Sequence, residues 1–390
     1  MKKLFAVLLV VLMALTLVGC SGSTSSEEST STEAAAIKLG GSGPITGAAA
    51  VYGLDVMNAA QLAVDEINAK EGTTYFEFKF EDDEADPEKA PNAYSALKDW
   101  GMQVSIYTTT SGAGAAVAAD YYADNTFALT PSGSNTALIN DGGSTRYTNA
   151  FQVCFTDPNQ GTASADYIAE KGLATKVAII YRSDDSYSTS IYETFKAEAA
   201  AKGLEIVSET SFIETDSDYS TQLKAAQEAG AELVFLPIYY TPASVILTQA
   251  NAMGYAPVFF GVDGMDGILA LEGFDTTLAE GVYLLTPFAA DATDDATVHF
   301  VTAFKEAYGS TPTQFAADAY DAVYAIYQAC KAKGVTADMS ASDICDLLVP
   351  EFESMTFEGI TGTATWKDTG EVSKSPKAVI ISNGSYVAAE

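Results

Sequence analysis

Histidine and cysteine are scarce in this chain of 390 residues. His299 is its one histidine, and its four cysteines include no C-x-x-C pair. A structural zinc needs several Cys or His ligands at short spacing, and a Ser-His or Cys-His catalytic pair needs a histidine base. We therefore expect no metal site, and any such catalytic pair would have to use His299.

Basic residues are also few. The sequence has 20 Lys and Arg against 52 Asp and Glu, which gives a formal net charge of −32. Because an acidic surface repels phosphate backbones, we expect no nucleic-acid partner. Hydrophobic residues make up 48% of the chain, enough for full-sized cores, so a globally disordered protein is excluded.

Motifs of common enzymes and cofactor sites are missing. The sequence contains no phosphate-binding G-x-x-x-x-G-K-[ST], no G-x-S-x-G elbow, no H-E-x-x-H and no EF-hand spacing. The acidic run at residues 81–88 is explained better by helix capping than by calcium, because Asp86 precedes Pro87. We expect no cofactor and no enzyme, with an acid-pair hydrolase as the alternative that missing motifs do not exclude.

The first 36 residues indicate export. A basic start is followed by the apolar run 4–18, which is short for a retained membrane span, and then by L-V-G-C ending at Cys20. This order resembles a bacterial lipoprotein signal, in which Cys20 is acylated and becomes the mature N-terminus. An uncleaved anchor with an ordinary Cys20 thiol is the alternative. We expect a signal peptide at residues 1–19, a flexible tether at 20–36, and an extracytoplasmic protein held on the membrane by lipid.

From Ile37 onward, short β-type runs alternate with segments of helical period. Residues 177–181 form a continuous apolar run, typical of a buried parallel strand, and apolar residues recur at helical spacing across 52–70. Such alternation predicts βαβ units, and its two successive runs predict two doubly wound parallel-sheet lobes. Further strands are expected at 37–40, 75–80, 104–107, 127–129, 205–207, 233–236 and 258–260. Further helices are expected at 87–100, 112–124, 162–171, 190–202, 219–229, 242–253, 313–333 and 343–352.

Small polar residues follow two neighbouring strands. Residues 107–112 read YTTTSG and residues 130–135 read TPSGSN. Hydroxyl and N–H groups at helix N-termini bind carboxylates, although such residues also serve as simple N-caps. Because ligands bind outside the carboxyl ends of parallel strands, the two turns indicate a carboxylate site in a cleft between the lobes.

A series of short segments occurs in a characteristic order between Ile37 and Val387. The segments are Ser42-Gly43-Pro44, Tyr52-Gly53, AVDEINAK at 63–70, Asp82-Asp83 with Asp86-Pro87, Thr130-Pro131, Ser134-Asn135, and Asp157 with Gln160-Gly161. Together they resemble the type I solute-binding proteins of ABC importers, most closely the leucine/isoleucine/valine-binding branch.

The resemblance implies two lobes joined by three crossovers. Lobe 1 would comprise residues 37–156 plus 288–362, and lobe 2 would comprise 157–287 plus 363–390. The cleft between them would close on a ligand, and the closed, monomeric protein would dock on a membrane permease.

The resemblance also implies a site for the α-carboxylate of an amino acid. After the third strand, Ser111 or Thr110 would hold the carboxylate. After the next strand, Ser134 would add a hydroxyl, together with backbone groups near Ser132.

The remaining implied contacts are acids and aromatic rings. Asp157 and Asp263 match the positions that meet the ammonium. Many relatives have the longer glutamate at the second position, so Asp263 would reach the ligand either directly or through water. Tyr187, Tyr240 and Tyr52 match positions that wall the ligand side chain, with lobe packing as the alternative.

These residue types suit a zwitterion, because both of its charges need partners when it leaves water. The leading hypothesis is a lipid-anchored protein that binds a branched-chain type of amino acid and delivers it to a permease. The alternatives are a binding protein for another small polar ligand, such as an amide, urea or an aromatic acid, and a ligand-sensing receptor domain.

The cysteines of the body leave two alternatives. Cys330 and Cys345 either form a disulfide, which an extracytoplasmic setting permits, or stay reduced and buried.

Overall fold

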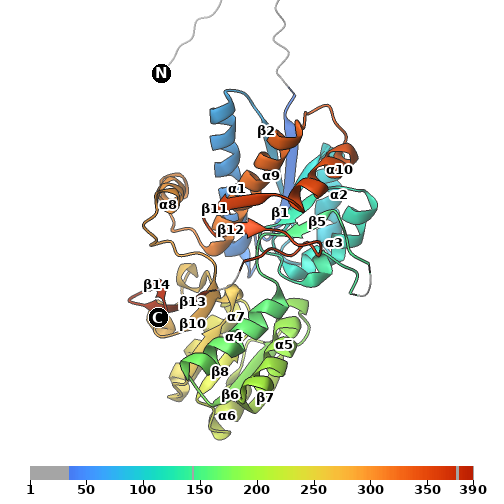
Figure 1. Ribbon diagram of the computed structural model, residues 1–390. Coiled ribbons are helices and arrows are strands. Elements are labelled where there is room, and N and C mark those ends of the chain that lie inside the picture. The colour runs from blue at the N-terminus through green and yellow to red at the C-terminus, as the bar shows by residue number, and fades with distance from the viewer. Residues whose placement is uncertain (1–34, 143–144, 375–376, 390) are drawn as a thin grey trace, which may run out of the picture. The chain divides into compact units, whose positions relative to one another are not determined.

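Two separate sheets flanked by helices make up the folded part of the chain (Figure 1). The computed structural model describes residues 35–142, 145–374 and 377–389, which belong to one compact unit. The fold confirms the predicted α/β class with two doubly wound lobes. The predicted signal peptide and Cys20 lie outside the described residues. Within the described ranges, no helix has both the length and the apolar character that a membrane span requires.

The first sheet has five parallel strands in the order β2-β1-β3-β4-β5. Glycines in β1 allow side chains of the neighbouring strand β3 to pack closely against it, since a Cβ at Gly41 would lie 2.5 Å from Ile106 Cγ1. Its elements are β1 (Ile37–Gly43), α1 (Ala50–Glu71), β2 (Phe76–Asp82), α2 (Ala90–Trp100), β3 (Val104–Thr108), α3 (Ser111–Ala123), β4 (Ala128–Thr130) and β5 (Ala150–Gln152).

The second sheet has seven strands in the order β14-β13-β10-β9-β8-β6-β7. Strands β6 to β10 are parallel, and the hairpin β13–β14 adds two antiparallel strands at one edge. Its elements are α4 (Asp157–Lys171), β6 (Lys176–Arg182), α5 (Ser186–Lys202), β7 (Glu205–Phe212), α6 (Ser220–Glu228), β8 (Leu233–Leu236), α7 (Tyr240–Met253), β9 (Val258–Gly261), β10 (Tyr283–Thr286), β13 (Lys377–Ser382) and β14 (Ser385–Ala388).

The chain crosses between the two sheets three times. It leaves the first sheet after β5, returns after β10, and leaves again before β13. The returning segment contains α8 (Asp295–Tyr308), α9 (Gln314–Lys333), α10 (Ala341–Phe352) and the small hairpin of β11 (Thr356–Gly359) and β12 (Gly362–Thr365). The three crossings agree with the predicted fold class, whereas the residue limits of the lobes remain a prediction.

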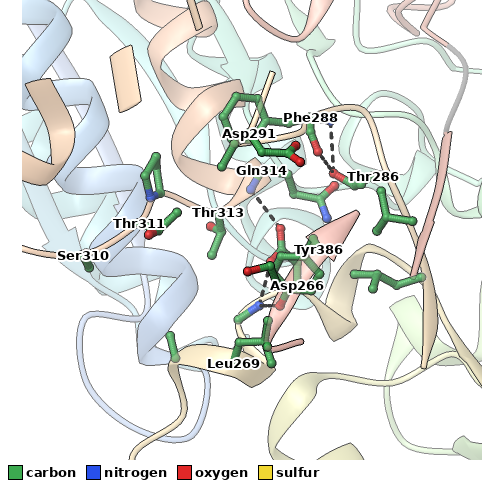
Figure 2. Close-up of a pocket in the computed structure, with 18 of the residues that line it drawn as sticks. Asp266, Leu269, Thr286, Phe288, Asp291, Ser310, Thr311, Thr313, Gln314 and Tyr386 are labelled. Carbon is green, nitrogen blue, oxygen red and sulfur yellow. Dashed lines mark hydrogen bonds between the residues drawn. The ribbon is translucent and has the colours of Figure 1, made fainter. Parts of the chain in front are cut away.

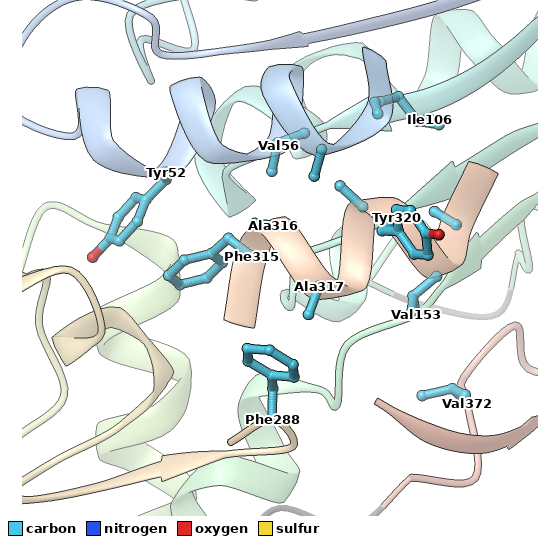
Figure 3. Close-up of a cluster of buried hydrophobic side chains, with 14 of the residues drawn as sticks. Tyr52, Val56, Ile106, Val153, Phe288, Phe315, Ala316, Ala317, Tyr320 and Val372 are labelled. Atoms are coloured by element: carbon cyan, nitrogen blue, oxygen red, sulfur yellow. The ribbon is translucent and has the colours of Figure 1, made fainter. Parts of the chain in front are cut away.

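Helix α9 packs along α1 through a buried apolar cluster (Figure 3). The ring centroids of Tyr52 and Phe315 lie 4.4 Å apart, and Val56 and Ala316 are buried between the helices. Alanine at position 316 lets the two helices approach closely. This packing fixes the N-terminus of α9 beside the start of α1, close to segments of both sheets.

Three predicted helices start elsewhere than expected. Helix α5 begins at Ser186 and not at residue 190, because Asp185 caps it and accepts a hydrogen bond from the Tyr187 N–H. Helix α4 begins at Asp157 and not near residue 162, because Thr156 caps it and accepts a hydrogen bond from the Asn159 N–H. Helix α2 begins at Ala90 and not at Pro87, because residues 87–89 form a preceding turn. Strand β10 follows a Gly- and Asp-containing stretch, and the sequence did not predict it.

Candidate functional site

A cavity of about 790 Å³ lies between loops that follow strands of both sheets. We call this cavity the groove. The first sheet lines it with the loops after β1, β2 and β3, and the second sheet with the loops after β6, β7 and β8. Ligands of parallel α/β sheets bind at such strand ends. The lining residues are Gly47, Ala48, Ala49, Glu84, Ala85, Asp86, Pro87, Glu88, Thr110, Gly112, Arg182, Asp184, Asp185, Ser186, Glu214, Ile238, Tyr239, Thr241 and Pro242.

The four predicted hydroxyl residues lie together at the start of α3. Ser111 Oγ and Ser134 Oγ are 3.5 Å apart, and Ser111 Oγ accepts a hydrogen bond from the Asn135 N–H. Ser132 Oγ donates to a backbone carbonyl of the β3–α3 turn at 2.7 Å, so its hydroxyl is already used within the protein. Thr110 is the N-cap residue of α3, but its side chain makes no capping bond.

The two predicted acids are buried near each other. Asp157 Oδ2 accepts a hydrogen bond from Asn135 Nδ2 at 2.8 Å, and Asp263 Oδ1 accepts one from the Tyr187 hydroxyl at 2.5 Å. Burial raises the pKa of Asp157 well above its ordinary value, and the charge of Asp263 adds to this effect. Burial also raises the pKa of Asp263 from 3.8 to about 7. Both carboxylates would be stabilised by a positive charge placed beside them.

Four buried polar atoms of this region have no hydrogen-bond partner within the described ranges: Thr110 Oγ1, Gln152 Oε1, Asp157 Oδ1 and Gln160 Nε2. Gln160 is held in place by its other atom, because its Oε1 accepts a bond from the Asp263 N–H at 3.1 Å. A buried polar atom without a partner costs about 1–3 kcal/mol. These four atoms comprise two acceptors, one donor and one hydroxyl that can donate or accept, and they are available for a polar ligand.

Tyr239, which the sequence reasoning missed, lines the groove in place of Tyr240. The Tyr239 ring lies 5.2 Å from that of Tyr52 and 5.0 Å from that of Tyr187. The Tyr240 hydroxyl accepts a hydrogen bond from the Val51 N–H, and its ring packs edge-on against Tyr52. The sequence offers no means of choosing between these two adjacent tyrosines.

Tyr52 connects segments of the two sheets. Its hydroxyl donates to the Gly264 carbonyl at 2.5 Å, and the Gly264 N–H donates to the Tyr187 hydroxyl at 2.9 Å. Of the nine predicted site residues, Thr110 is the one that lines the groove itself. The other eight are buried, and the hydrogen bonds and ring contacts described above join them into neighbouring groups.

A second pocket, of about 470 Å³, lies where the N-terminus of α9 meets the second sheet (Figure 2). There the Gln314 N–H donates to Asp266 Oδ2 at 2.9 Å, and the Gly267 N–H donates to the Tyr386 hydroxyl at 3.2 Å. Among the described residues that line it, no buried side-chain nitrogen or oxygen lacks a partner. None of the nine predicted site residues lines this pocket.

The cysteines and acids form no disulfide or metal centre in the described part of the chain. Cys154, Cys330 and Cys345 are all buried free thiols. Of the two alternatives for Cys330 and Cys345, the structure therefore has the reduced one, and the disulfide is not present. No group of three His, Cys, Asp or Glu residues among those described could hold a metal ion.

Two α/β sheets with strand-end loops on both sides of a polar cavity are the arrangement expected of a two-lobed solute-binding protein. A family model described as "Periplasmic binding protein" matches residues 36–379, and the chain belongs to this family. The family is one of extracytoplasmic binding proteins and not of enzymes.

Named relatives extend over most of the chain. A Leu/Ile/Val-binding protein homolog of Brucella melitensis is 26% identical and is aligned over 86% of this chain and 89% of its own length. A leucine-, isoleucine-, valine-, threonine- and alanine-binding protein of Pseudomonas aeruginosa is 24% identical, with 86% and 87% covered.

Solved structures agree on the fold. The branched-chain amino acid transporter substrate-binding protein of Streptococcus pneumoniae, in complex with isoleucine, has a TM-score of 0.81 at 27% identity, covering 91% of this chain and 99% of that one. A solute-binding protein of R. palustris, in complex with benzoate, has a TM-score of 0.80 at 20% identity, covering 90% and 95%. At that lower identity the likeness concerns the fold alone.

Proposed function

We propose that this protein is the lipid-anchored substrate-binding protein of an ABC importer, which binds an amino acid in the groove and delivers it to a membrane permease. The observation that carries the proposal is the set of unpartnered buried atoms beside the groove, Thr110 Oγ1, Asp157 Oδ1 and Gln160 Nε2. The names of the relatives make branched-chain amino acids the first candidates.

In the proposed complex the two sheets hold opposite ends of the zwitterion. Thr110 and Ser111, at the N-terminus of α3, and Ser134 receive the α-carboxylate, which the helix dipole also favours. Asp157 and Asp263 receive the ammonium. Burial raises the pKa of both acids because it disfavours their charged forms. An ammonium between them would stabilise those charged forms and would also give Asp157 Oδ1 a hydrogen-bond donor.

The ligand then favours closure of the two lobes. It can shift the balance between open and closed forms only by its extra affinity for the closed form. That extra affinity arises when residues 37–156 on one side and residues 157–287 on the other contact the same molecule. The permease would recognise the closed form.

An aromatic acid is the alternative that hydroxyl and N–H groups at a helix N-terminus leave open, because they bind any carboxylate. Such a ligand has a carboxylate but no ammonium. It would leave Asp157 Oδ1 buried without a partner, so the geometry favours an amino acid. Amides, urea and a ligand-sensing role without a permease are the further alternatives.

A thermal-shift screen of amino acids, amides and aromatic acids tests the proposal. A ligand present at 100 times its Kd should raise the apparent stability by about 2.7 kcal/mol. We expect stabilisation by at least one free amino acid and by no N-acetylated or amidated form of it, because those forms lack one of the two charges. Stabilisation by aromatic acids alone would contradict the proposal.

The lipid anchor has a separate test. We expect the exported protein to carry acyl chains on Cys20 and to sediment with membranes. The Cys20→Ser variant should be released or should retain its uncleaved leader, because no acyl acceptor is left. Unmodified Cys20 in the mature wild-type protein, seen by mass spectrometry, would exclude the anchor and leave the ligand proposal intact.

A further inference from the structure

The charge of the groove indicates which side chain its ligand carries. Six carboxylates line the groove, on Glu84, Asp86, Glu88, Asp184, Asp185 and Glu214, against the single basic side chain of Arg182. We propose that the ligand is a basic amino acid, whose cationic side chain extends from the buried zwitterion site into this acidic part of the groove. The inference rests on the proposed function and adds to it the class of the side chain.

The cations at the groove are already neutralised. Arg182 Nε lies 2.8 Å from Asp184 Oδ1, and Arg182 Nη2 lies 3.1 Å from Glu214 Oε2. Lys89, just outside the lining, pairs with Glu84 at 2.6 Å. These cations therefore have little capacity left to hold an anionic ligand.

Three of the lining acids have no basic partner. Asp86 and Glu88, in the β2–α2 loop, and Asp185, at the start of α5, form no ion pair with any Lys, Arg or His in the described ranges. Asp86 Oδ1 accepts the Glu88 N–H, and Asp185 Oδ1 accepts the Tyr187 N–H, so both carboxylates are held in place by backbone bonds. Carboxylates without a direct ion-pair partner among the described residues thus lie at the groove on loops of both sheets.

Thr110 supplies a second, independent sign of a polar ligand. Its side chain lines the groove and is 4% exposed, and its Oγ1 has no partner among the described residues. The neighbouring Gly47, Ala49 and Gly112 are small and leave room beside it. A branched aliphatic side chain would gain little from this polar surface, whereas an ammonium or guanidinium would gain attraction from both sides.

The test compares each basic amino acid with a neutral molecule of similar shape. Calorimetry on the full chain in mild detergent would measure the Kd of L-arginine against L-citrulline, of L-lysine against L-norleucine, and of L-leucine and L-isoleucine. We expect at least one basic amino acid to bind about tenfold or more tightly than its neutral counterpart. We also expect the difference to shrink as the salt concentration rises.

A variant pair connects this preference to the groove. Glu88 is exposed and makes no side-chain bond that the fold requires among those described. Glu88→Gln should reduce the preference for the basic ligand about two- to fivefold, and Glu88→Lys should reduce it further. Glu306→Gln removes an exposed acid on α8, outside the groove, and should leave the preference unchanged.

The outcomes separate the two proposals. If leucine or isoleucine binds as tightly as lysine and arginine, the inference about the side chain is wrong and the proposed function stands. Equal loss of preference in Glu88→Gln and Glu306→Gln would also overturn the inference, because the effect would then come from the overall charge. If no free amino acid binds, the proposed function fails and the inference fails with it.

Discussion

The groove and the second pocket differ in how their buried polar atoms find hydrogen-bond partners. In the second pocket, Asp266 and Tyr386 bond to backbone N–H groups of the protein itself, and no lining buried side-chain atom of the described residues lacks a partner. At the groove, the lining residue Thr110 has a buried Oγ1 without a partner, and Asp157 Oδ1 is also unpaired, on a side chain that Asn135 connects to the lining residue Ser186. The fold therefore satisfies the buried polar atoms of the second pocket by itself, whereas the buried polar atoms at the groove need a ligand to find partners.

The comparison shows that pocket size does not identify a binding site in this protein. Both pockets are large enough for a small molecule, at about 790 and 470 Å³. The unpaired atoms distinguish the two pockets, because a buried donor or acceptor without a hydrogen bond costs about 1–3 kcal/mol, and the folded protein alone does not recover this free energy.

The largest expected effect comes from Asp157. Asp157→Asn keeps the size of the side chain but removes its charge, so the ligand ammonium loses its buried counterion. We expect affinity for an amino acid ligand to fall by about 30-fold or more, as truncated buried charge pairs cost about 2–5 kcal/mol. Asp291→Asn, in the second pocket, is the matched control. Calorimetry should find its affinity unchanged, and an equal loss in both variants would remove the distinction between the pockets.

The pH dependence of binding should also be large. The pKa of Asp263 is raised to about 7, so this acid is mostly protonated at pH 5.5 and ionised at pH 8. Binding of an ammonium should weaken about tenfold or more between pH 8 and pH 5.5, and Asp263→Asn should flatten this profile.

In the ligand-free protein, Asp263 should make the fold more stable at low pH, which is opposite to the pH dependence of binding. Its folded-state pKa lies above the ordinary 3.8, so its stabilising contribution is complete below about pH 4 and is lost as the pH rises through 7. A ligand-free melting profile for Asp263→Asn that matches the wild-type profile across this range would show that Asp263 does not titrate there.

A matched pair of threonine variants compares the two pockets directly. Thr110→Val removes an unpaired hydroxyl, so the ligand-free protein should keep its stability or gain up to about 1 kcal/mol while affinity falls several-fold. Thr286→Val, in the second pocket, removes a hydroxyl that bonds to both the N–H and the carbonyl of Phe288. It should cost about 1–3 kcal/mol of stability and leave affinity unchanged. Denaturant unfolding would measure the stability of each variant, and calorimetry its affinity. A loss of affinity in Thr286→Val, or unchanged affinity in Thr110→Val, would contradict the prediction.

The smallest expected effect concerns two neighbouring serines. Ser132 Oγ already donates to the Thr109 carbonyl, so Ser132→Ala should cost about 1 kcal/mol of stability with little change in affinity. Ser111→Ala should lower both stability and affinity, because its Oγ accepts the buried Asn135 N–H and also belongs to the proposed carboxylate site. If Ser132→Ala lowered affinity and Ser111→Ala did not, Ser132 would be the residue that contacts the ligand.

The sequence predicted the fold and one residue that lines the groove, Thr110, because local signals mark both. Runs such as residues 233–236 have the composition of a buried strand, and Thr110 and Ser111 stand directly after a strand, where ligands of parallel sheets bind. Helix α4 began earlier than predicted because a single threonine caps it, and its Gly- and Ser-containing first turns hid the helical period.

The rest of the groove depends on how distant loops meet. Tyr239 and Tyr240 are adjacent and chemically identical, so the local sequence could not tell which ring faces the groove. Glu88 and Asp185 are ordinary loop acids until the fold places them at one cavity. The disulfide alternative for Cys330 and Cys345 likewise depended on distances that spacing along the chain does not determine.

The most direct measurement is a crystal structure of the protein with the amino acid that stabilises it most. We expect the ligand in the groove, with its ammonium within hydrogen-bond distance of Asp157 Oδ1 and its carboxylate at Thr110 and Ser111. A ligand seated instead beside Asp266 and Tyr386 would contradict the account, as would one in the groove that leaves Asp157 Oδ1 and Thr110 Oγ1 unpaired.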